Sequence, residues 1–217
     1  MKSNSSKRVV LITGGTTRLG AVIADYLELL SWRVIRTSHR ADAGADIVVD
    51  LSRPDGPEML FKAAKDLLGD DKLDAIVNNA ALFALDDTDV MALNYYAPKR
   101  LIELMSKEAH RGVVVNILDS RILSREALTP YERSKKALKE CTLEYARRYL
   151  GVLRVNAVAP GPVLVPTTVH EAAGRTPFGR PEPKDVAQAV AFLLDASTTT
   201  GCIIPVDGGQ SFFTYNV

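Results

Sequence analysis

Residues 8–20 read Arg-Val-Val-Leu-Ile-Thr-Gly-Gly-Thr-Thr-Arg-Leu-Gly, and this stretch decides how the rest of the chain is interpreted. A short apolar, β-branched run leads into a turn that contains three glycines, and residues 19–30 then carry helical spacing. Glycines between a strand and a helix allow a tight turn and a close approach of the backbone to a pyrophosphate. The same glycines would also serve a turn that only needs a positive φ, so the position of the turn in the chain matters.

The alternation of short apolar runs with helical segments continues along the chain. Near-continuous apolar runs suit parallel strands that are covered on both faces. The expected strands are 8–13, 32–37, 45–49, 73–77, 112–118, 153–158 and 202–206, and the expected helices are 19–30, 54–68, 94–109, 131–150 and 183–195. The pattern predicts an α/β fold with a Rossmann-like, doubly wound parallel sheet of about seven strands. We expect a single domain over residues 1–217, with 1–7 as a flexible N-terminus.

Two details refine this expectation. Pro54 and Pro183 suit the first turn of a helix, where a missing amide proton costs nothing. Residues 39–46 connect the second and third strands, and this length is shorter than the roughly dozen residues that a helical crossover needs. The crossover helix is therefore expected to be missing or reduced to a turn.

The composition excludes several classes of protein. The net charge of +1 gives no general attraction to nucleic acid or to an acidic membrane. The two cysteines, Cys141 and Cys202, are too few for a disulfide framework and suit a reducing compartment. Residues 1–8 lack the apolar core of a signal peptide, and no apolar run reaches membrane-spanning length. We expect a cytoplasmic protein that has no nucleic-acid or membrane partner.

Tyr131 and Lys135 stand four residues apart at the start of an expected helix, so their side chains lie on one face. A phenol with a pKa of roughly 10 is a poor proton shuttle at neutral pH. A nearby ammonium favours the phenolate and brings the group closer to its working range. On their own, the two residues are also compatible with an ordinary solvated helix face.

Taken together, the motifs resemble the short-chain dehydrogenase/reductase family across nearly the whole chain. The segments that match in order and approximate spacing are 13–20, Asp50, Asn78-Asn79-Ala80, Asn94, the strand end 116–119, Tyr131 with Lys135, Pro160-Gly161 and 206–209. The resemblance implies that Tyr131 is the proton donor or acceptor. It also implies that Lys135 binds the nicotinamide ribose and that Asn94 supports a water chain to Lys135.

The resemblance further implies a dinucleotide site and no metal. The residues expected to bind the cofactor are Gly14, Thr16, Arg18, Leu19, Gly20, Ser38, His39, Arg40, Asp50, Leu51, Asn78, Ala80, Tyr131, Lys135, Pro160 and Gly161. Three of the matching motifs have plainer interpretations. Asn78 and Asn79 are also compatible with strand-capping amides, Asn94 with a helix N-cap, and Pro160-Gly161 with a simple turn.

Two departures from the family pattern favour NADP(H) as the cofactor. Arg18 stands where most members have a glycine, and a cation at a helix N-terminus opposes the macrodipole unless an anion binds there. After the second strand, an acidic residue usually accompanies NAD, whereas this chain has Thr37-Ser38-His39-Arg40. Asp42 leaves NAD as the minority alternative, although it lies a few residues late.

The third departure concerns the strand end Asn116-Ile117-Leu118-Asp119, where the family usually has serine in the last position. Ser120 follows at once and competes for the role, but a shift of one residue along a strand reverses the side-chain direction. Taking Asn116 as the anchor selects Asp119, as in pteridine and dihydromonapterin reductases. We expect the Asp119 carboxylate to repel a developing oxyanion and to favour a substrate with N–H donors, such as a pterin.

These features predict an NADP(H)-dependent oxidoreductase that transfers hydride between nicotinamide and a carbonyl or imine carbon, with a pteridine as the specific expectation. One alternative is a general carbonyl reductase acting on 3-oxoacyl or sugar substrates, in which Ser120 takes the serine role. A different class is a non-catalytic dinucleotide-binding regulatory module. Residues 162–179 should cover the substrate, and no role is assigned there to His170 and Arg175, or to Arg180 just beyond.

The family resemblance also implies a homodimer or homotetramer. Helices 94–109 and 131–150 would pack against their copies. Their apolar residues Leu101, Leu104, Leu138, Leu143 and Tyr149 suit a buried face between subunits, although a single-subunit core would use several of them equally well.

Overall fold

A computed structural model describes residues 7–41, 44–83, 87–108, 111–124, 129–163 and 176–212. Seven parallel strands form one sheet in the order β3-β2-β1-β4-β5-β6-β7. The strands are β1 Val9–Ile12, β2 Arg33–Ser38, β3 Ile47–Val48, β4 Ala75–Asn78, β5 Gly112–Ile117, β6 Leu153–Pro160 and β7 Ile203–Val206. The predicted doubly wound parallel sheet is therefore confirmed.

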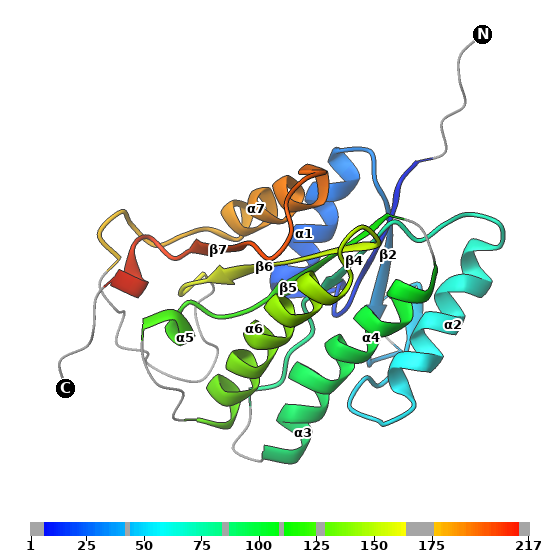
Figure 1. Cartoon of the computed structure of the whole chain (residues 1–217), viewed down its shortest axis with the longest axis horizontal. Helices are drawn as coiled ribbons and strands as arrows, with labels where there is room; N and C mark the ends of the chain where they lie inside the picture. Colours follow the sequence, from blue (N-terminus) through cyan, green and yellow to red (C-terminus); the bar gives the residue numbers. More distant parts are fainter. Residues whose placement is uncertain are drawn as a thin grey trace, which may run out of the picture.

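Helices cover both faces of the sheet (Figure 1). On one face lie α1 Arg18–Leu29 and α7 Pro183–Asp195, and on the other lie α2 Gly56–Leu68, α4 Ala97–Met105 and α6 Pro130–Arg148. Strand β1 shows why the apolar runs are continuous. Val9 and Leu11 pack into the core beneath the second helix layer, and Val10 and Ile12 pack into the core beneath α1 and α7.

The connection between β2 and β3 is short, as predicted. Its described residues, 39–41 and 44–46, contain no helix. The two strands nevertheless pair in parallel, with Thr37 opposite Ile47 and Ser38 opposite Val48. This short connection brings the end of β2 beside the loop after β3.

Three expectations about helices need correction. Pro54 precedes α2, and the proline in the first turn of that helix is Pro57. The helix expected at 94–109 begins earlier, with α3 Asp87–Met91, and continues through a π-helical turn, Ala92–Tyr96, into α4. Asn94 therefore lies inside a helical segment, and its interpretation as an N-cap is wrong. A short helix that was not expected, α5 Arg121–Ser124, follows β5.

Helix α6 begins where the sequence indicates, and a capping box explains its position. The Thr129 hydroxyl accepts a hydrogen bond from the Glu132 amide, and the Glu132 carboxylate accepts one from the Thr129 amide. This start fixes Tyr131 in the first turn of the helix and Lys135 one turn later. Within the part of the chain that the structure describes, no helix is long and apolar enough to cross a membrane.

Candidate active site

A cavity of about 880 Å³ lies at the carboxyl ends of β1, β2 and β4. The strand order reverses between β1 and β4, the place where open α/β sheets bind ligands. Of the predicted cofactor residues, those that line the cavity are Gly14, Thr16, Arg18, Leu19, Gly20, Ser38, His39, Arg40, Asp50, Leu51, Ala80 and Tyr131. Asn78, Lys135, Pro160 and Gly161 do not line it, and neither do the predicted catalytic residues Asn94 and Asp119.

The glycine turn after β1 is built for close approach. A Cβ atom on Gly20 would lie 2.0 Å from the Gly14 carbonyl oxygen, so only glycine fits there. Gly14 itself has a φ of 62°. Arg18 also has a positive φ, 51°, although it is not glycine, and its exposed side chain lines the cavity. A positive φ is uncommon for a residue other than glycine, so the backbone at the start of α1 is unusual beside the cavity.

At the end of β4, the residue that holds the glycine turn is Asn79, the neighbour of the predicted cofactor residue Asn78. The Asn79 side-chain amide donates to the carbonyl oxygens of Thr13 and Gly14 at 3.0 and 3.2 Å. The Thr13 hydroxyl in turn accepts from the backbone amides of Asn79 and Ala80. Asn78 is buried and donates to Asn116 on β5 at 2.8 Å, so it joins the two strand ends beneath the cavity.

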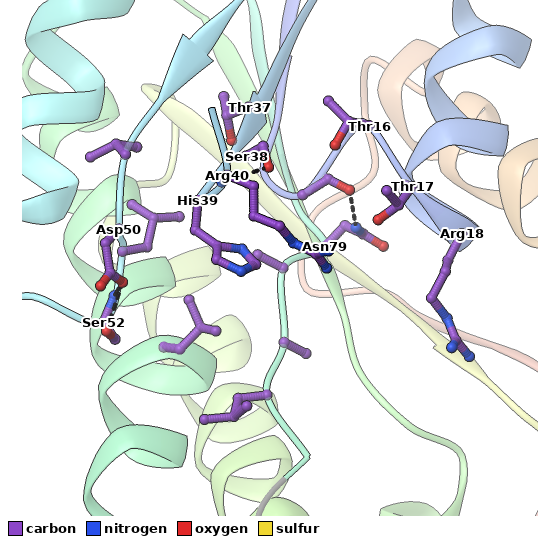
Figure 2. A pocket seen from close by; sticks show the side chains of 18 of the residues that line it. Thr16, Thr17, Arg18, Thr37, Ser38, His39, Arg40, Asp50, Ser52 and Asn79 are labelled. Carbon is purple, nitrogen blue, oxygen red and sulfur yellow. Dashed lines mark hydrogen bonds between the residues drawn. The ribbon is translucent and has the colours of Figure 1, made fainter. Parts of the chain in front are cut away.

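Polar groups at the end of β2 point into the cavity. Figure 2 shows His39 and Arg40 extending from this strand end, with Asp50 on one side and Arg18 on the other. The Ser38 hydroxyl accepts a hydrogen bond from the Arg40 amide at 3.0 Å, which orders the turn. Hydrogen bonds from Ser52 hold the pKa of the Asp50 carboxyl below its usual value. The carboxylate at this edge of the cavity is therefore that of Asp50, in the loop after β3.

Lys135 lies beneath the Tyr131 ring. Its side chain is almost fully buried, and its ammonium donates to the Ile117 carbonyl oxygen at 2.7 Å. The Nζ atom lies 5.7 Å from the centre of the Tyr131 ring. Burial lowers the pKa of Lys135 to about 8, against the opposing effect of the Asp119 charge. The pair predicted from its four-residue spacing is thus brought together.

The Asn94 side chain links two segments of the chain through three hydrogen bonds. Its side-chain oxygen accepts from the Leu82 amide at 2.7 Å, and its side-chain nitrogen donates to the Leu82 carbonyl oxygen at 2.9 Å and to the Ser134 hydroxyl at 3.0 Å. These bonds tie the loop after β4 to helix α6. They thereby place that loop beside Tyr131.

Asp119 and Ser120 have different surroundings at the end of β5. The Asp119 carboxylate accepts bonds from the backbone amide, Nε and Nη2 of Arg121 at 2.9, 3.1 and 2.9 Å. Ser120 is fully buried and donates to the Gln210 side-chain oxygen at 3.4 Å. Arg121 is therefore the counter-ion of Asp119, a partner that the expected effect of the Asp119 charge on the substrate did not include.

Sequence reasoning missed two residues that contact Tyr131. Phe83 is 65% exposed, and its ring centre lies 4.9 Å from that of Tyr131. The Arg121 guanidinium carbon lies 5.7 Å from the Tyr131 ring centre. Phe83 gave a weak signal, an aromatic residue a few positions after Asn79. Arg121 gave none beyond its position next to Ser120.

The remaining predicted residues lie away from the cavity lining or outside the described residues. Pro160 is the last residue of β6 and pairs with Val206, so the interpretation of Pro160-Gly161 as a simple turn is wrong. A Cβ atom on Gly161 would lie 2.8 Å from Asp207. Arg180 is exposed and does not line the cavity. Asp42, His170 and Arg175 lie outside the described residues, which contain no cluster of side chains able to hold a metal ion.

Comparison with known proteins agrees with this geometry. A family model described as enoyl-(acyl carrier protein) reductase matches residues 20–211. An uncharacterised oxidoreductase of Schizosaccharomyces pombe is 32% identical, covering 93% of this chain and 90% of its own length. Cyclopentanol dehydrogenase of Comamonas is 30% identical, covering 94% and 97%. The chain therefore belongs to the short-chain dehydrogenase/reductase family, whose members are oxidoreductases that use a nicotinamide cofactor.

Solved structures show the same architecture. FolM alternative dihydrofolate reductase 1 from Brucella canis, complexed with NADP, superposes with a TM-score of 0.82 at 29% identity over 96% of both chains. The aldohexose dehydrogenase of Thermoplasma acidophilum has a TM-score of 0.84 at 24% identity over 97% of this chain and 96% of its own. The second similarity concerns the fold alone. The glycine turn and the cavity beside it fit a dinucleotide, since the turn leads into the N-terminus of α1, where unpaired backbone amides suit a pyrophosphate.

Proposed function

We propose that this protein is an NADP(H)-dependent reductase that transfers hydride between nicotinamide and a carbonyl or imine carbon, with a pteridine as the substrate class. The observation that carries the cofactor assignment is the pair of basic residues, His39 and Arg40, at the end of β2 (Figure 2). A basic residue at this position accommodates the extra phosphate of NADP. Arg18, at the opposite side of the cavity, adds a third basic group.

The nicotinamide cofactor supplies the hydride when it is bound. The chain's own residues supply the proton and the orientation. Tyr131 donates a proton from its hydroxyl, and Lys135 provides positive charge beneath the ring. Asn94 holds the loop after β4 against α6, so the substrate side of the site keeps its shape.

Two features support a flat heterocyclic substrate. The exposed Phe83 ring beside Tyr131 offers a stacking surface, and aromatic pairs are worth about 0.5–1.5 kcal/mol beyond their buried area. The Brucella structure similar to this chain is a dihydrofolate reductase by its description. The alternative, a general carbonyl reductase with Ser120 in the serine role, is weakened because Ser120 is fully buried and bonded to Gln210.

A substrate panel tests this proposal. We expect NADPH oxidation with dihydropterins to exceed that with quinones and simple ketones. Phe83→Ala should raise KM for a dihydropterin roughly tenfold, because a lost stacking contact of about 1.4 kcal/mol corresponds to that factor. The matched control is Phe192→Ala, which removes an exposed ring from α7 in the other helix layer.

The outcomes separate the three candidate functions. Preferential turnover of ketones, 3-oxoacyl thioesters or sugars, with KM unaffected by Phe83→Ala, would indicate a general carbonyl reductase. Binding of NADPH without turnover of any compound would indicate the non-catalytic module. The closeness of Lys135 to the Tyr131 ring argues against the non-catalytic module.

Assembly into a homodimer or homotetramer is part of the proposal, and the burial of the predicted interface residues bears on which of them could serve it. Leu101 and Leu138 are buried within the subunit, so they cannot also serve an interface. Leu104, Leu143 and Tyr149 are only half-buried, although Leu104 and Tyr149 also pack against the subunit core. Light scattering at micromolar concentration should give a mass of two or four chains, and Leu143→Arg should lower it. A monomer mass for the unmodified protein would contradict this assembly.

Cytoplasmic localisation and the absence of nucleic-acid or membrane partners stay predictions.

A further inference from the structure

Arg121 and Asp119 form a local ion pair at the edge of the site. The guanidinium Nε and Nη2 atoms donate to the two carboxylate oxygens at 3.1 and 2.9 Å, in the forked geometry that makes arginine–carboxylate pairs strong. The Arg121 backbone amide adds a third bond to Oδ1. The two side chains are only 27% and 15% exposed, so water screens the pair weakly.

Tyr131 is the group on which this pair acts. Arg121 and Lys135 each lie 5.7 Å from the Tyr131 ring centre, measured from Cζ and Nζ. Asp119 is close enough to Lys135 to influence its ammonium. Arg121 begins α5, directly after the strand end that carries Asp119, so one short stretch of chain places both charges.

Among the described residues, three further acidic side chains lie on α3 or next to Tyr131 on α6, and two of them are held by other groups. On α3, Asp87 is paired with Arg133 of α6 at 2.7 Å. Asp89, also on α3, lines the cavity. Glu132, next to Tyr131 on α6, is buried in the capping box with Thr129. On the β5 side of the phenol, the charged groups that the described residues provide are Asp119, Arg121 and Lys135.

We propose that Arg121 is a positioning residue for the reaction: it cancels the charge of Asp119 and leaves the surroundings of the Tyr131 phenol net positive. The inference rests on Tyr131 as the proton donor of the proposed function. A carboxylate cannot donate a hydrogen bond to a carbonyl oxygen, and alone it would repel negative charge that develops there. Pairing with Arg121 removes that repulsion and allows an aspartate to stand at the end of β5.

The test is a titration of Tyr131 that needs no substrate. Tyrosinate formation is followed by ultraviolet difference spectroscopy on the protein saturated with NADP⁺, and the signal of Tyr131 is isolated by subtracting the Tyr131→Phe form of each variant. Arg121→Gln removes a cation and leaves the Asp119 carboxylate unpaired, so the net charge near the phenol falls by one unit. We expect the titration midpoint of Tyr131 to rise by roughly one pH unit.

The second substitution separates an electrostatic role from a structural one. Adding Asp119→Asn to Arg121→Gln restores neutrality without restoring the bond geometry, and the midpoint should return toward that of the unmodified protein. Arg121→Lys keeps the positive charge and loses the forked geometry of the guanidinium, so the titration midpoint of Tyr131 in this variant should stay near the original value. Thermal unfolding and NADPH titration of each variant verify that it is folded.

Two results would overturn the inference. If Arg121→Gln leaves the Tyr131 midpoint unchanged in a folded protein, the pair does not act on the phenol. If the midpoint rises but the double variant stays as high as the single one, the effect comes from displaced structure and not from charge. Because the titration uses no substrate, a failed substrate panel would leave this measurement valid, and a failed titration would leave the panel result standing.

Discussion

Replacing Tyr131 with phenylalanine should lower kcat/KM for the preferred substrate by about 10²–10⁴-fold, the range typical for loss of a general acid. The substitution removes one hydroxyl and keeps the ring that packs against Phe83. Binding of NADPH should therefore change little. Steady-state rates and a fluorescence titration with NADPH measure the two quantities separately.

Tyr26→Phe provides the matched control for this experiment. Tyr26 is half-buried on α1 and does not line the cavity, so its hydroxyl should be dispensable. Full activity of Tyr131→Phe would contradict the assignment of the proton donor. A loss of NADPH binding equal to the loss of rate would instead indicate that Tyr131 serves the cofactor alone.

Replacing Arg40 with aspartate should weaken NADPH binding by roughly 10²-fold while sparing NADH. A hydrogen bond to a charged group contributes about 1.5–3 kcal/mol, and 1.4 kcal/mol corresponds to a factor of ten. The new carboxylate would also repel the extra phosphate of NADPH and accept hydrogen bonds from the ribose hydroxyls of NADH. Dissociation constants for both cofactors, measured at one fixed salt concentration, test this expectation.

Arg33→Asp is the matched control because Arg33 begins the same strand, β2, at its opposite end, where it pairs with Asp71. It should change overall stability slightly and leave the ratio of the two dissociation constants unaltered. If the unmodified protein binds NADH as tightly as NADPH, the assignment of His39 and Arg40 to the phosphate is wrong.

The fold was predictable because its signals are local and repeated. The apolar run 112–118 appears in the structure as the fully buried strand β5, within one residue of the expected bounds. The spacing of Tyr131 and Lys135 placed both on one helix, since helical geometry follows from the chain itself. The glycine turn was found for the same reason: its backbone geometry permits no side chain at Gly20.

The features that the sequence did not reveal depend on contacts between distant segments. The π-helical turn at Ala92–Tyr96 includes Asn94, whose side chain is hydrogen-bonded to the backbone of Leu82. Helix propensities carry no information about a contact between these two segments. The short helix α5 and the bond from Arg121 to Asp119 were not predicted from the sequence. A charged residue at a strand end is interpreted as solvent-exposed until its partner is known. The packing of Phe83 on Tyr131 could not be predicted, because it depends on the position of the loop after β4.

The π-helical turn sets a limit on how this chain can be altered. It takes up about one residue more than an α-helical turn, so the helices before and after it keep their relative orientation. Loss of a single residue within Ala92–Tyr96 would convert the turn to α-helix and would change how Asn94 is presented to Leu82 and Ser134. The number of residues here is consequently as constrained as their identity, and substitutions at exposed positions such as Tyr96 should be tolerated where deletions are not.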